Sequence, residues 1–178
     1  AESLLSIDEI ESVIRASLTR GFDAFRFTGG EPLVRDGIAD LMLRVSRLAA
    51  VRKLSLSTNA SLLERFLPQL AAARVFSLNV SLDTLDAGRF YQITRGGELG
   101  PTLAGIDAAS QDGRFRIKLN AVLMRGFNDD ELAKLAALTV ERPVHVRFIE
   151  YMPFGSWARG EGLENPSMSV GEALERLK

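Results

Sequence analysis

Apolar and polar residues alternate along five stretches of the chain, and a stretch with helical spacing follows each of the first four. We expect strands at residues 24–28, 53–58, 76–83, 115–123 and 144–150. We expect helices between them at about residues 36–49, 61–73, 86–93 and 101–111, with another beginning after Asn128 and Glu131. Strands that alternate with helices are typical of βαβ units around a parallel sheet. The pattern therefore predicts an α/β fold of about five parallel strands with flanking helices.

Capping signals predict one more helix near each end of the chain. Ser6 and Glu9 have the spacing of a capping box, and Gly21 is a suitable residue to end the helix that follows. Ser169 and Glu172 repeat this spacing near the other end.

The two sides of the expected strands differ in polarity. One set of alternate positions is apolar: Phe25, Phe27, Leu54, Leu56, Leu78, Val80, Leu82, Ile117, Leu119, Ala121, Val146 and Phe148. The other set is polar: Arg26, Thr28, Ser55, Ser57, Ser77, Asn79, Ser81, Asp83, Arg116, Lys118, Asn120, His145 and Arg147. Parallel strands covered by helices on both sides are usually apolar throughout, so we expect the apolar set to pack on helices and the polar set to line a cavity. The alternative is an antiparallel sheet with one solvated face, which the intervening helices disfavour.

Three cations, Arg26, Lys118 and Arg147, belong to this polar set. Unpaired charges in a cavity are costly, so such cations need anions as partners. A phosphate-bearing ligand meets that need.

The first expected strand runs into the turn Thr28-Gly29-Gly30-Glu31-Pro32. The two glycines leave backbone N–H and C=O groups open to close approach, and Pro32 ends the strand. Glu31 adds an acceptor that suits a ligand ammonium group. An ordinary turn between a strand and a helix explains these residues equally well.

Composition and charge argue against a membrane-spanning protein, a disulfide-stabilised protein and a protein that binds nucleic acid through its net charge. The 178 residues are enough for one domain with a sizeable core, and 46% of them are hydrophobic. The formal net charge of −1 gives no electrostatic reason to expect a nucleic-acid or membrane partner. No apolar run reaches the roughly 20 residues of a membrane span and no signal peptide is evident, so we expect a cytoplasmic protein. The chain has no cysteine, which excludes disulfides and thiolate-ligated metals within it.

Six short stretches together resemble the MoaA family, the GTP 3′,8-cyclases of the radical S-adenosylmethionine (SAM) superfamily. They are residues 26–33, 56–59, 79–83, 117–120, 125–129 and 147–152, in the family's order and spacing. The resemblance implies a partial (β/α)6 TIM-type barrel that binds SAM and GTP. It also implies a lyase that converts GTP to (8S)-3′,8-cyclo-7,8-dihydroguanosine 5′-triphosphate, the first step of molybdenum-cofactor biosynthesis, with two [4Fe–4S] clusters. The downstream partner in that pathway is cyclic pyranopterin monophosphate synthase.

The resemblance also assigns ligand contacts to individual residues. SAM-contact positions fall on Gly29, Gly30, Glu31, Ser81 and Met152. GTP-contact positions fall on Arg26, Ser57, Lys118 and Arg147. It assigns no catalytic residue and no metal ligand to this chain. Asp83 and Glu150 lie at strand ends, where helix capping and salt bridging compete with ligand contact, and we expect His145 to be a packed or hydrated residue.

The chain departs from the family pattern in its cluster ligands. Neither the family's CxxxCxxC loop nor its second set of cysteines is present, and Ala60 follows Asn59 where the family usually has glycine. We therefore expect an internal fragment of a MoaA protein. Residues 1–155 should form a barrel core without the first strand and cluster loop, and residues 156–178 a loop and the start of a helix.

Such a fragment should be inactive and bind no iron, and it should self-associate through the exposed edge of strand 24–28. The alternatives are a cluster-free nucleotide-binding protein and another radical SAM enzyme.

Overall fold

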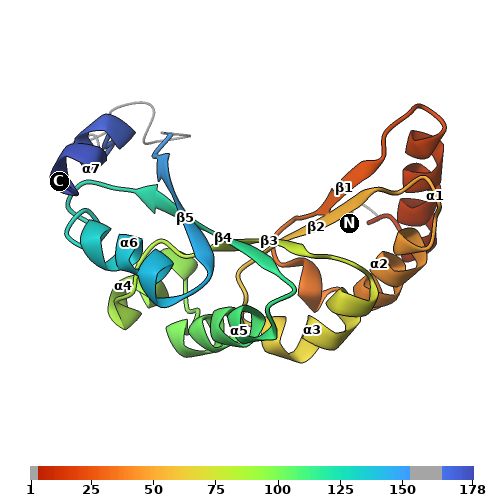
Figure 1. Cartoon of the computed structure of the whole chain (residues 1–178), viewed down its shortest axis with the longest axis horizontal. Coiled ribbons are helices and arrows are strands. Elements are labelled where there is room, and N and C mark those ends of the chain that lie inside the picture. Colours follow the sequence, from red (N-terminus) through yellow and green to blue (C-terminus); the bar gives the residue numbers. More distant parts are fainter. Residues whose placement is uncertain (1–3, 153–165) are drawn as a thin grey trace. The chain divides into compact units, whose positions relative to one another are not determined.

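A computed structural model of the chain describes residues 4–152 and 166–178 (Figure 1). Its elements, in chain order, are α1 Ile7–Leu18, β1 Ala24–Phe27, the 3₁₀ turn η1 Pro32–Val34, α2 Ile38–Ser46, β2 Lys53–Thr58, α3 Leu63–Ala72, β3 Ser77–Ser81, α4 Ala87–Thr94, α5 Leu99–Asp112, β4 Arg116–Leu123, α6 Leu132–Glu141, β5 Val144–Glu150 and α7 Val170–Arg176. Among the described residues, none of the helices is long and apolar enough to cross a membrane.

The strands form one sheet in the order β1-β2-β3-β4-β5. β1 pairs in parallel with β2, and β2 pairs in parallel with β3. The expected α/β fold of parallel strands is therefore confirmed, and the antiparallel alternative is wrong. β1 lies at one end of this order and is an edge strand among the described residues. The self-association that we expect from this edge stays a prediction.

Two elements differ from the sequence-based expectation. η1 follows the glycine turn, where no helix was expected. β3 ends at Ser81 instead of Asp83, because the Asp83 carboxylate accepts the Val122 N–H at 2.8 Å. In a continuing strand, a backbone carbonyl would occupy that donor.

The chain divides into two compact units. The first comprises Ala1–Val80 and Pro101–Ile117, and the second comprises Ser81–Gly100 and Lys118–Lys178. The expected boundary between residues 155 and 156 lies outside the described residues.

The core of the first unit combines strand residues with the inner faces of two helices. Leu56 and Leu78 from the strands, Leu41 and Met42 from α2, and Leu70 from α3 are all fully buried. The apolar set of strand positions is thus the side that packs on helices, as expected. Burying a side chain of this size stabilises the fold by about 1.5–3 kcal/mol.

Helix α5 approaches the turn after β2 very closely. A Cβ added at Gly105 would lie 2.4 Å from the Ala60 carbonyl oxygen, so only glycine fits there. The buried Thr102 hydroxyl donates to the Asn59 carbonyl at 3.0 Å in the same contact. This packing fixes the turn that ends β2.

Both capping signals are confirmed. The Ser6 hydroxyl accepts the Glu9 N–H at 3.2 Å, and the Glu9 carboxylate accepts the Ser6 N–H at 2.7 Å. These hydrogen bonds hold the pKa of Glu9 below its ordinary value. The Ser169 hydroxyl accepts the Glu172 N–H at 3.1 Å at the start of α7.

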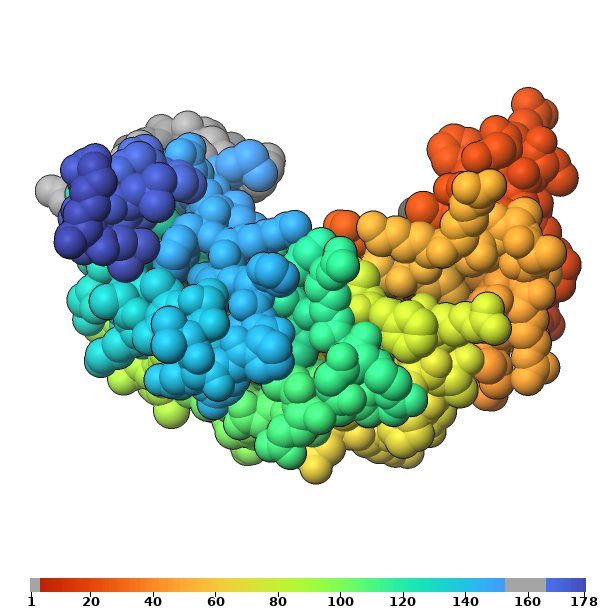
Figure 2. Space-filling model, viewed as in Figure 1, coloured from red at the N-terminus to blue at the C-terminus, as the bar shows by residue number. Residues whose placement is uncertain are grey.

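In the second unit, α7 packs on the end of β4 and the start of α6. Leu123, Leu132, Met168 and Ala173 form its buried apolar contact, with Phe148 and Leu177 at the margin. The space-filling view shows α7 in blue beside the cyan residues of α6 (Figure 2).

Ion pairs connect α7 to the segment between β4 and α6. Arg125 makes a bidentate pair with Glu172 at 2.8 and 2.7 Å, and Arg176 binds Asp129 at 2.9 Å. The Arg125 guanidinium holds the pKa of the Glu172 carboxyl below its ordinary value.

Asn128 connects two backbone segments of the second unit. Its amide nitrogen donates to the carbonyls of Asp83 and Val122, at 2.7 and 2.8 Å, and its oxygen accepts the Met124 N–H at 2.8 Å. The side chain is fully buried. One residue therefore joins the segment after β3 to the end of β4.

We predict that Asn128→Ala lowers the free energy of unfolding by about 3 kcal/mol, because it leaves buried backbone groups without partners. Urea unfolding measures this change. The exposed Gln92→Ala on α4 is the control and should stay within about 0.5 kcal/mol of the wild type. Equal stability of the two variants would contradict the prediction.

Candidate functional site

The Glu31 carboxylate ties the glycine turn after β1 to the end of β2. It accepts the Leu33 N–H at 3.0 Å, the Asn59 N–H at 2.6 Å and the Thr58 hydroxyl at 2.9 Å. The Thr58 side chain is buried, and its hydroxyl also accepts the Ala60 N–H at 3.0 Å. Glu31 therefore has a structural role in the first unit. The expected contact between Glu31 and a ligand ammonium group stays a prediction.

The backbone of the same turn is open. Gly29 and Gly30 are exposed, and a Cβ added at either would meet nothing within 4 Å. Gly29 has φ +154°, a conformation that L side chains rarely adopt. The turn thus combines a fixed backbone with bare N–H and C=O groups, which suits a ligand that binds main-chain atoms.

Arg26 and Ser57 lie on the polar side of β1 and β2. Arg26 stands opposite Ser55 in the ladder, and Ser57 is two residues further along the same side of β2. Arg26 is exposed, and within the described ranges no ion pair or hydrogen bond engages its guanidinium. The first unit thus brings together Arg26, Ser57 and the turn residues Gly29, Gly30 and Glu31.

The second unit holds the other predicted contacts. Ser81 is exposed at the end of β3, Lys118 is half-buried on the polar side of β4, and Arg147 is exposed on β5. In the part of the chain that the structure describes, Arg147 makes no ion pair. Met152, two residues beyond β5, is 64% exposed. The two groups of residues belong to different compact units.

The ambiguous residues at strand ends have structural partners. Glu150 accepts the N–H of Val170, the first residue of α7, at 2.9 Å, so it caps that helix. Asp83 accepts the Val122 N–H, and burial raises the pKa of its carboxyl above the ordinary value. His145 is exposed.

Sequence reasoning missed a buried carboxylate in the second unit. Glu131 is 4% exposed and binds the Thr84 hydroxyl, the Leu85 N–H at 3.0 Å and Arg89 at 3.3 Å. Arg89 also makes a bidentate pair with Asp130 at 2.5 and 2.9 Å, which raises the pKa of Arg89 and lowers that of Asp130. From the sequence, Glu131 was identified only as a residue near the start of a helix. Its buried contacts could not be predicted, because its partners lie more than 40 residues earlier in the chain.

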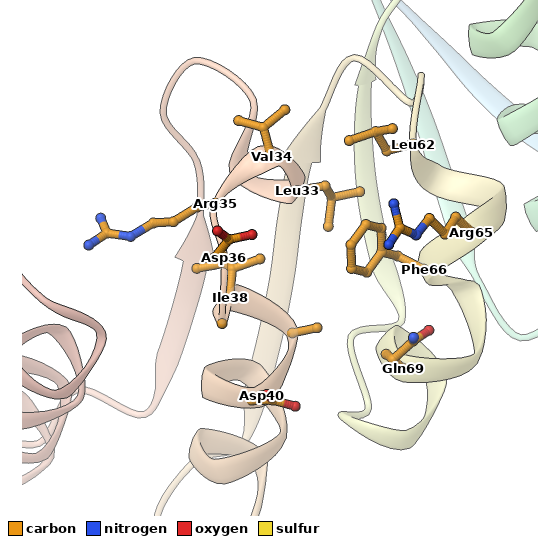
Figure 3. Close-up of a pocket in the computed structure, with 12 residues that line it drawn as sticks. Leu33, Val34, Arg35, Asp36, Ile38, Asp40, Leu62, Arg65, Phe66 and Gln69 are labelled. Carbon is orange, nitrogen blue, oxygen red and sulfur yellow. The ribbon is translucent and has the colours of Figure 1, made fainter.

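A cavity of about 440 Å³ lies in the first unit between η1, the start of α2 and α3. Figure 3 shows Leu33 pointing from η1 toward the α3 side, where Phe66 and Arg65 lie. The Arg65 guanidinium lies 5.5 Å from the centre of the Phe66 ring. None of the predicted contact residues lines this cavity, so it is separate from the polar side of the strands.

No group of acidic or histidine side chains in the described residues has the arrangement of a metal site. The chain has no cysteine, so its residues do not fit an iron–sulfur cluster. In the first unit, the exposed Arg26 and the open backbone at Gly29 and Gly30 are groups that can hydrogen-bond a polar or anionic ligand.

A model of the Radical SAM superfamily matches residues 1–139. The chain is 46% identical over 174 residues to a GTP 3′,8-cyclase from Pelotomaculum thermopropionicum, covering 96% of this chain and 53% of that protein. It is 47% identical over 161 residues to GTP 3′,8-cyclase 1 from Pseudomonas aeruginosa, covering 90% of this chain and 49% of that protein. The expected resemblance is thereby confirmed, and the chain spans about half the length of these relatives.

Solved structures show the same fold. A radical SAM methyltransferase from Sphaerobacter thermophilus matches with a TM-score of 0.67 at 20% identity, covering 95% of this chain and 51% of that one. The protein anSMEcpe with bound AdoMet matches with a TM-score of 0.70 at 15% identity, covering 99% of this chain and 49% of that one. At such identities the likeness concerns the fold alone, and it agrees with the expected fold class.

We predict that Glu31→Gln lowers the free energy of unfolding by about 1–3 kcal/mol, because its new NH2 group would face hydrogen-bond donors. Chemical denaturation followed by circular dichroism measures this change. Glu64→Gln, on the exposed first turn of α3, is the matched control. The prediction is wrong if the two variants unfold at the same denaturant concentration.

We also predict a pH-dependent effect of Asp83→Asn. Burial raises the folded-state pKa of Asp83, so its contribution to stability is complete below the ordinary value of 3.8 and is lost as pH rises through the folded-state value. Asparagine keeps an acceptor for the Val122 N–H and does not titrate. The variant should therefore be more stable than the wild type at pH 7, and this advantage should shrink as the pH falls. Unfolding curves at several pH values test it, and an advantage that grows toward low pH would refute it.

Proposed function

Because this chain belongs to the radical SAM superfamily, we propose that it is the SAM- and GTP-binding part of a GTP 3′,8-cyclase of molybdenum-cofactor biosynthesis. The reaction is the conversion of GTP to (8S)-3′,8-cyclo-7,8-dihydroguanosine 5′-triphosphate. The observation that carries the proposal is the identity of 46% to a protein of that name over 96% of the chain. The product would pass to cyclic pyranopterin monophosphate synthase.

The polar sides of the strands support a triphosphate substrate. Arg26 and Arg147 are exposed and have no carboxylate partner among the described residues, so a phosphate can bind either without breaking an internal ion pair. Lys118 adds a third cation on the same set of alternate strand positions. Charge-assisted hydrogen bonds from such groups are stronger than neutral ones. We assign Arg26, Ser57, Lys118 and Arg147 to GTP.

The bare turn supports SAM binding. Gly29 and Gly30 offer main-chain groups at the end of β1, and parallel sheets commonly bind ligands at the carboxyl ends of their strands. Ser81 also lies at the end of a strand, and Met152 lies just beyond another. We assign Gly29, Gly30, Glu31, Ser81 and Met152 to SAM, which supplies the radical chemistry of this superfamily when bound.

This chain's own residues bind and orient the two ligands. It has no cysteine, so none of its side chains fits as a ligand of a [4Fe–4S] cluster. The two clusters that the resemblance implies need thiolates from outside these residues. The isolated chain is therefore expected to be inactive.

The experiment uses the full-length protein that carries this chain, with its clusters reconstituted under anaerobic conditions. Incubation with GTP, SAM and a reductant should yield the cyclised nucleotide and 5′-deoxyadenosine, both identified by mass spectrometry. Binding of GTP without any cleavage of SAM would instead support the second candidate, a cluster-free nucleotide-binding protein. The lack of cysteine in this chain is the observation that favours that candidate. Cleavage of SAM with a substrate other than GTP would indicate another radical SAM enzyme.

We predict that Lys118→Ala weakens GTP binding by roughly tenfold, because it removes a charge-assisted hydrogen bond worth about 1.5–3 kcal/mol. SAM binding should stay within about twofold of the wild type. Lys53→Ala, an exposed lysine at the start of β2, is the control and should change neither affinity. Isothermal titration calorimetry of the reconstituted protein measures both ligands. Loss of SAM binding with unchanged GTP binding would reverse the assignment.

A further inference from the structure

The cavity between η1, the start of α2 and α3 has an apolar floor. Leu33 and Ile38 line it and are 3% and 5% exposed, and the half-buried Leu62 and Phe66 line it from the α3 side. Its volume of about 440 Å³ falls within the range of about 300–1,000 Å³ that is typical of small-molecule sites, which are lined mainly by apolar side chains. The residues assigned to SAM and GTP do not line it.

Opposite charges lie on the two walls of this cavity. Asp36 and Asp40 are on the side of η1 and α2, whereas Arg65 is on the α3 side (Figure 3). All three side chains are exposed, and none makes an ion pair or a side-chain hydrogen bond within the described residues. A second arginine that lines the cavity, Arg35, donates to the Leu5 carbonyl and points away from the α3 side. The aspartates and Arg65 are therefore available to a ligand that reaches both walls.

The chemistry of the walls and the floor selects the kind of ligand. An ammonium group is the partner for the aspartates, and a carboxylate has the planar geometry that a guanidinium binds best. An apolar body would cover the floor and be removed from water there. An apolar α-amino acid is a small ligand that has all three parts. Inorganic phosphate would meet two carboxylates, and a simple cation would leave Arg65 and the floor without contacts.

We propose that this cavity binds a free amino acid with an apolar side chain. Its ammonium group pairs with Asp36 or Asp40, and its carboxylate pairs with Arg65. Its side chain packs between Leu33 and Phe66. The site is separate from the SAM and GTP contacts, so its existence does not depend on the proposed function.

The test uses the full-length protein that carries this chain, with S-adenosylhomocysteine and GTP added so that the proposed sites for SAM and GTP are occupied. Isothermal titration calorimetry measures four probes: L-phenylalanine, phenethylamine, 3-phenylpropionate and L-serine. Relative to phenylalanine, the second probe lacks the carboxylate, the third lacks the ammonium group and the fourth lacks the apolar body. Phenylalanine should bind most tightly, and each of the others should bind more weakly by about fivefold or more.

Variants of the two walls should separate the two charges. Arg65→Gln should weaken phenylalanine by about five- to tenfold, the effect of one lost charge-assisted hydrogen bond, and leave phenethylamine unchanged. The double variant Asp36→Asn and Asp40→Asn should weaken phenylalanine and phenethylamine but not 3-phenylpropionate. Arg47→Gln and Glu64→Gln are the matched controls, because both residues are exposed on the same two helices outside the cavity. Neither control should change the affinity for any probe.

Equal affinities for all four probes would overturn the proposal, as would wall variants that bind phenylalanine like the wild type. A wild type that binds no probe at millimolar concentration would also overturn it. Sedimentation then shows what the cavity does instead: if Arg65→Gln abolishes self-association of the wild type, the cavity is a contact between copies of the chain. Loss of S-adenosylhomocysteine or GTP binding in the wild type would count against the proposed function alone.

Discussion

The first unit depends on one carboxylate at the end of its sheet. Where parallel strands end, the backbone N–H groups of the following turns lose their ladder partners and need acceptors. Glu31 supplies acceptors for Leu33 and Asn59 and also binds the Thr58 hydroxyl. Because these donors follow β1 and end β2, one side chain fixes two neighbouring turns. Because Glu31 holds the turn, Gly29 and Gly30 beside it can keep their backbone N–H and C=O groups accessible to a ligand.

In the second unit, buried polar residues at the start of α6 provide the hydrogen-bond partners for the backbone at the strand ends. Asn128 satisfies the ends of β4 and the segment after β3, and Glu131 binds the Thr84 hydroxyl and the Leu85 N–H. Removing one partner from such a network leaves the others unsatisfied, so its members depend on each other. In both units, side chains distant in sequence hold the strand ends from which the proposed ligand contacts project.

Local patterns predicted most of the fold, whereas distant polar contacts could not be read from the sequence. The alternation of polarity identified all five strands, and the Ser6–Glu9 spacing identified α1. Those signals act over a few residues. Asn128 donates a hydrogen bond to Asp83, 45 residues earlier in the chain, and no local sequence pattern predicts that contact. The premature end of β3 has the same origin, since Val122 and the Asp83 carboxylate meet only in the folded chain.

The strand residues of the candidate site were marked by the same alternation of polarity, and their ligand contacts stay predictions. The polarity of alternate positions is enough to mark Arg26, Lys118 and Arg147, because the period of a strand is fixed. The same reasoning placed Asn120 on the polar side of β4. Only the folded chain shows that its oxygen is buried without a donor among the described residues. A sequence states which side of a strand a residue occupies, but burial depends on the neighbouring strands.

Arg26 on β1 and Arg147 on β5 have no carboxylate partner among the described residues. On helices and loops, arginines such as Arg44, Arg89 and Arg125 are neutralised by carboxylates. The strands instead contain basic residues and a single carboxylate among the described residues, Glu150, which caps α7. An exposed cation without an internal carboxylate partner attracts counter-ions and anionic ligands. An exposed arginine without a bound ligand lowers the stability of the fold very little, because water solvates its charge. A phosphate can therefore bind such an arginine without breaking an internal ion pair. A substrate site built from strand residues depends on cations that are available in this way.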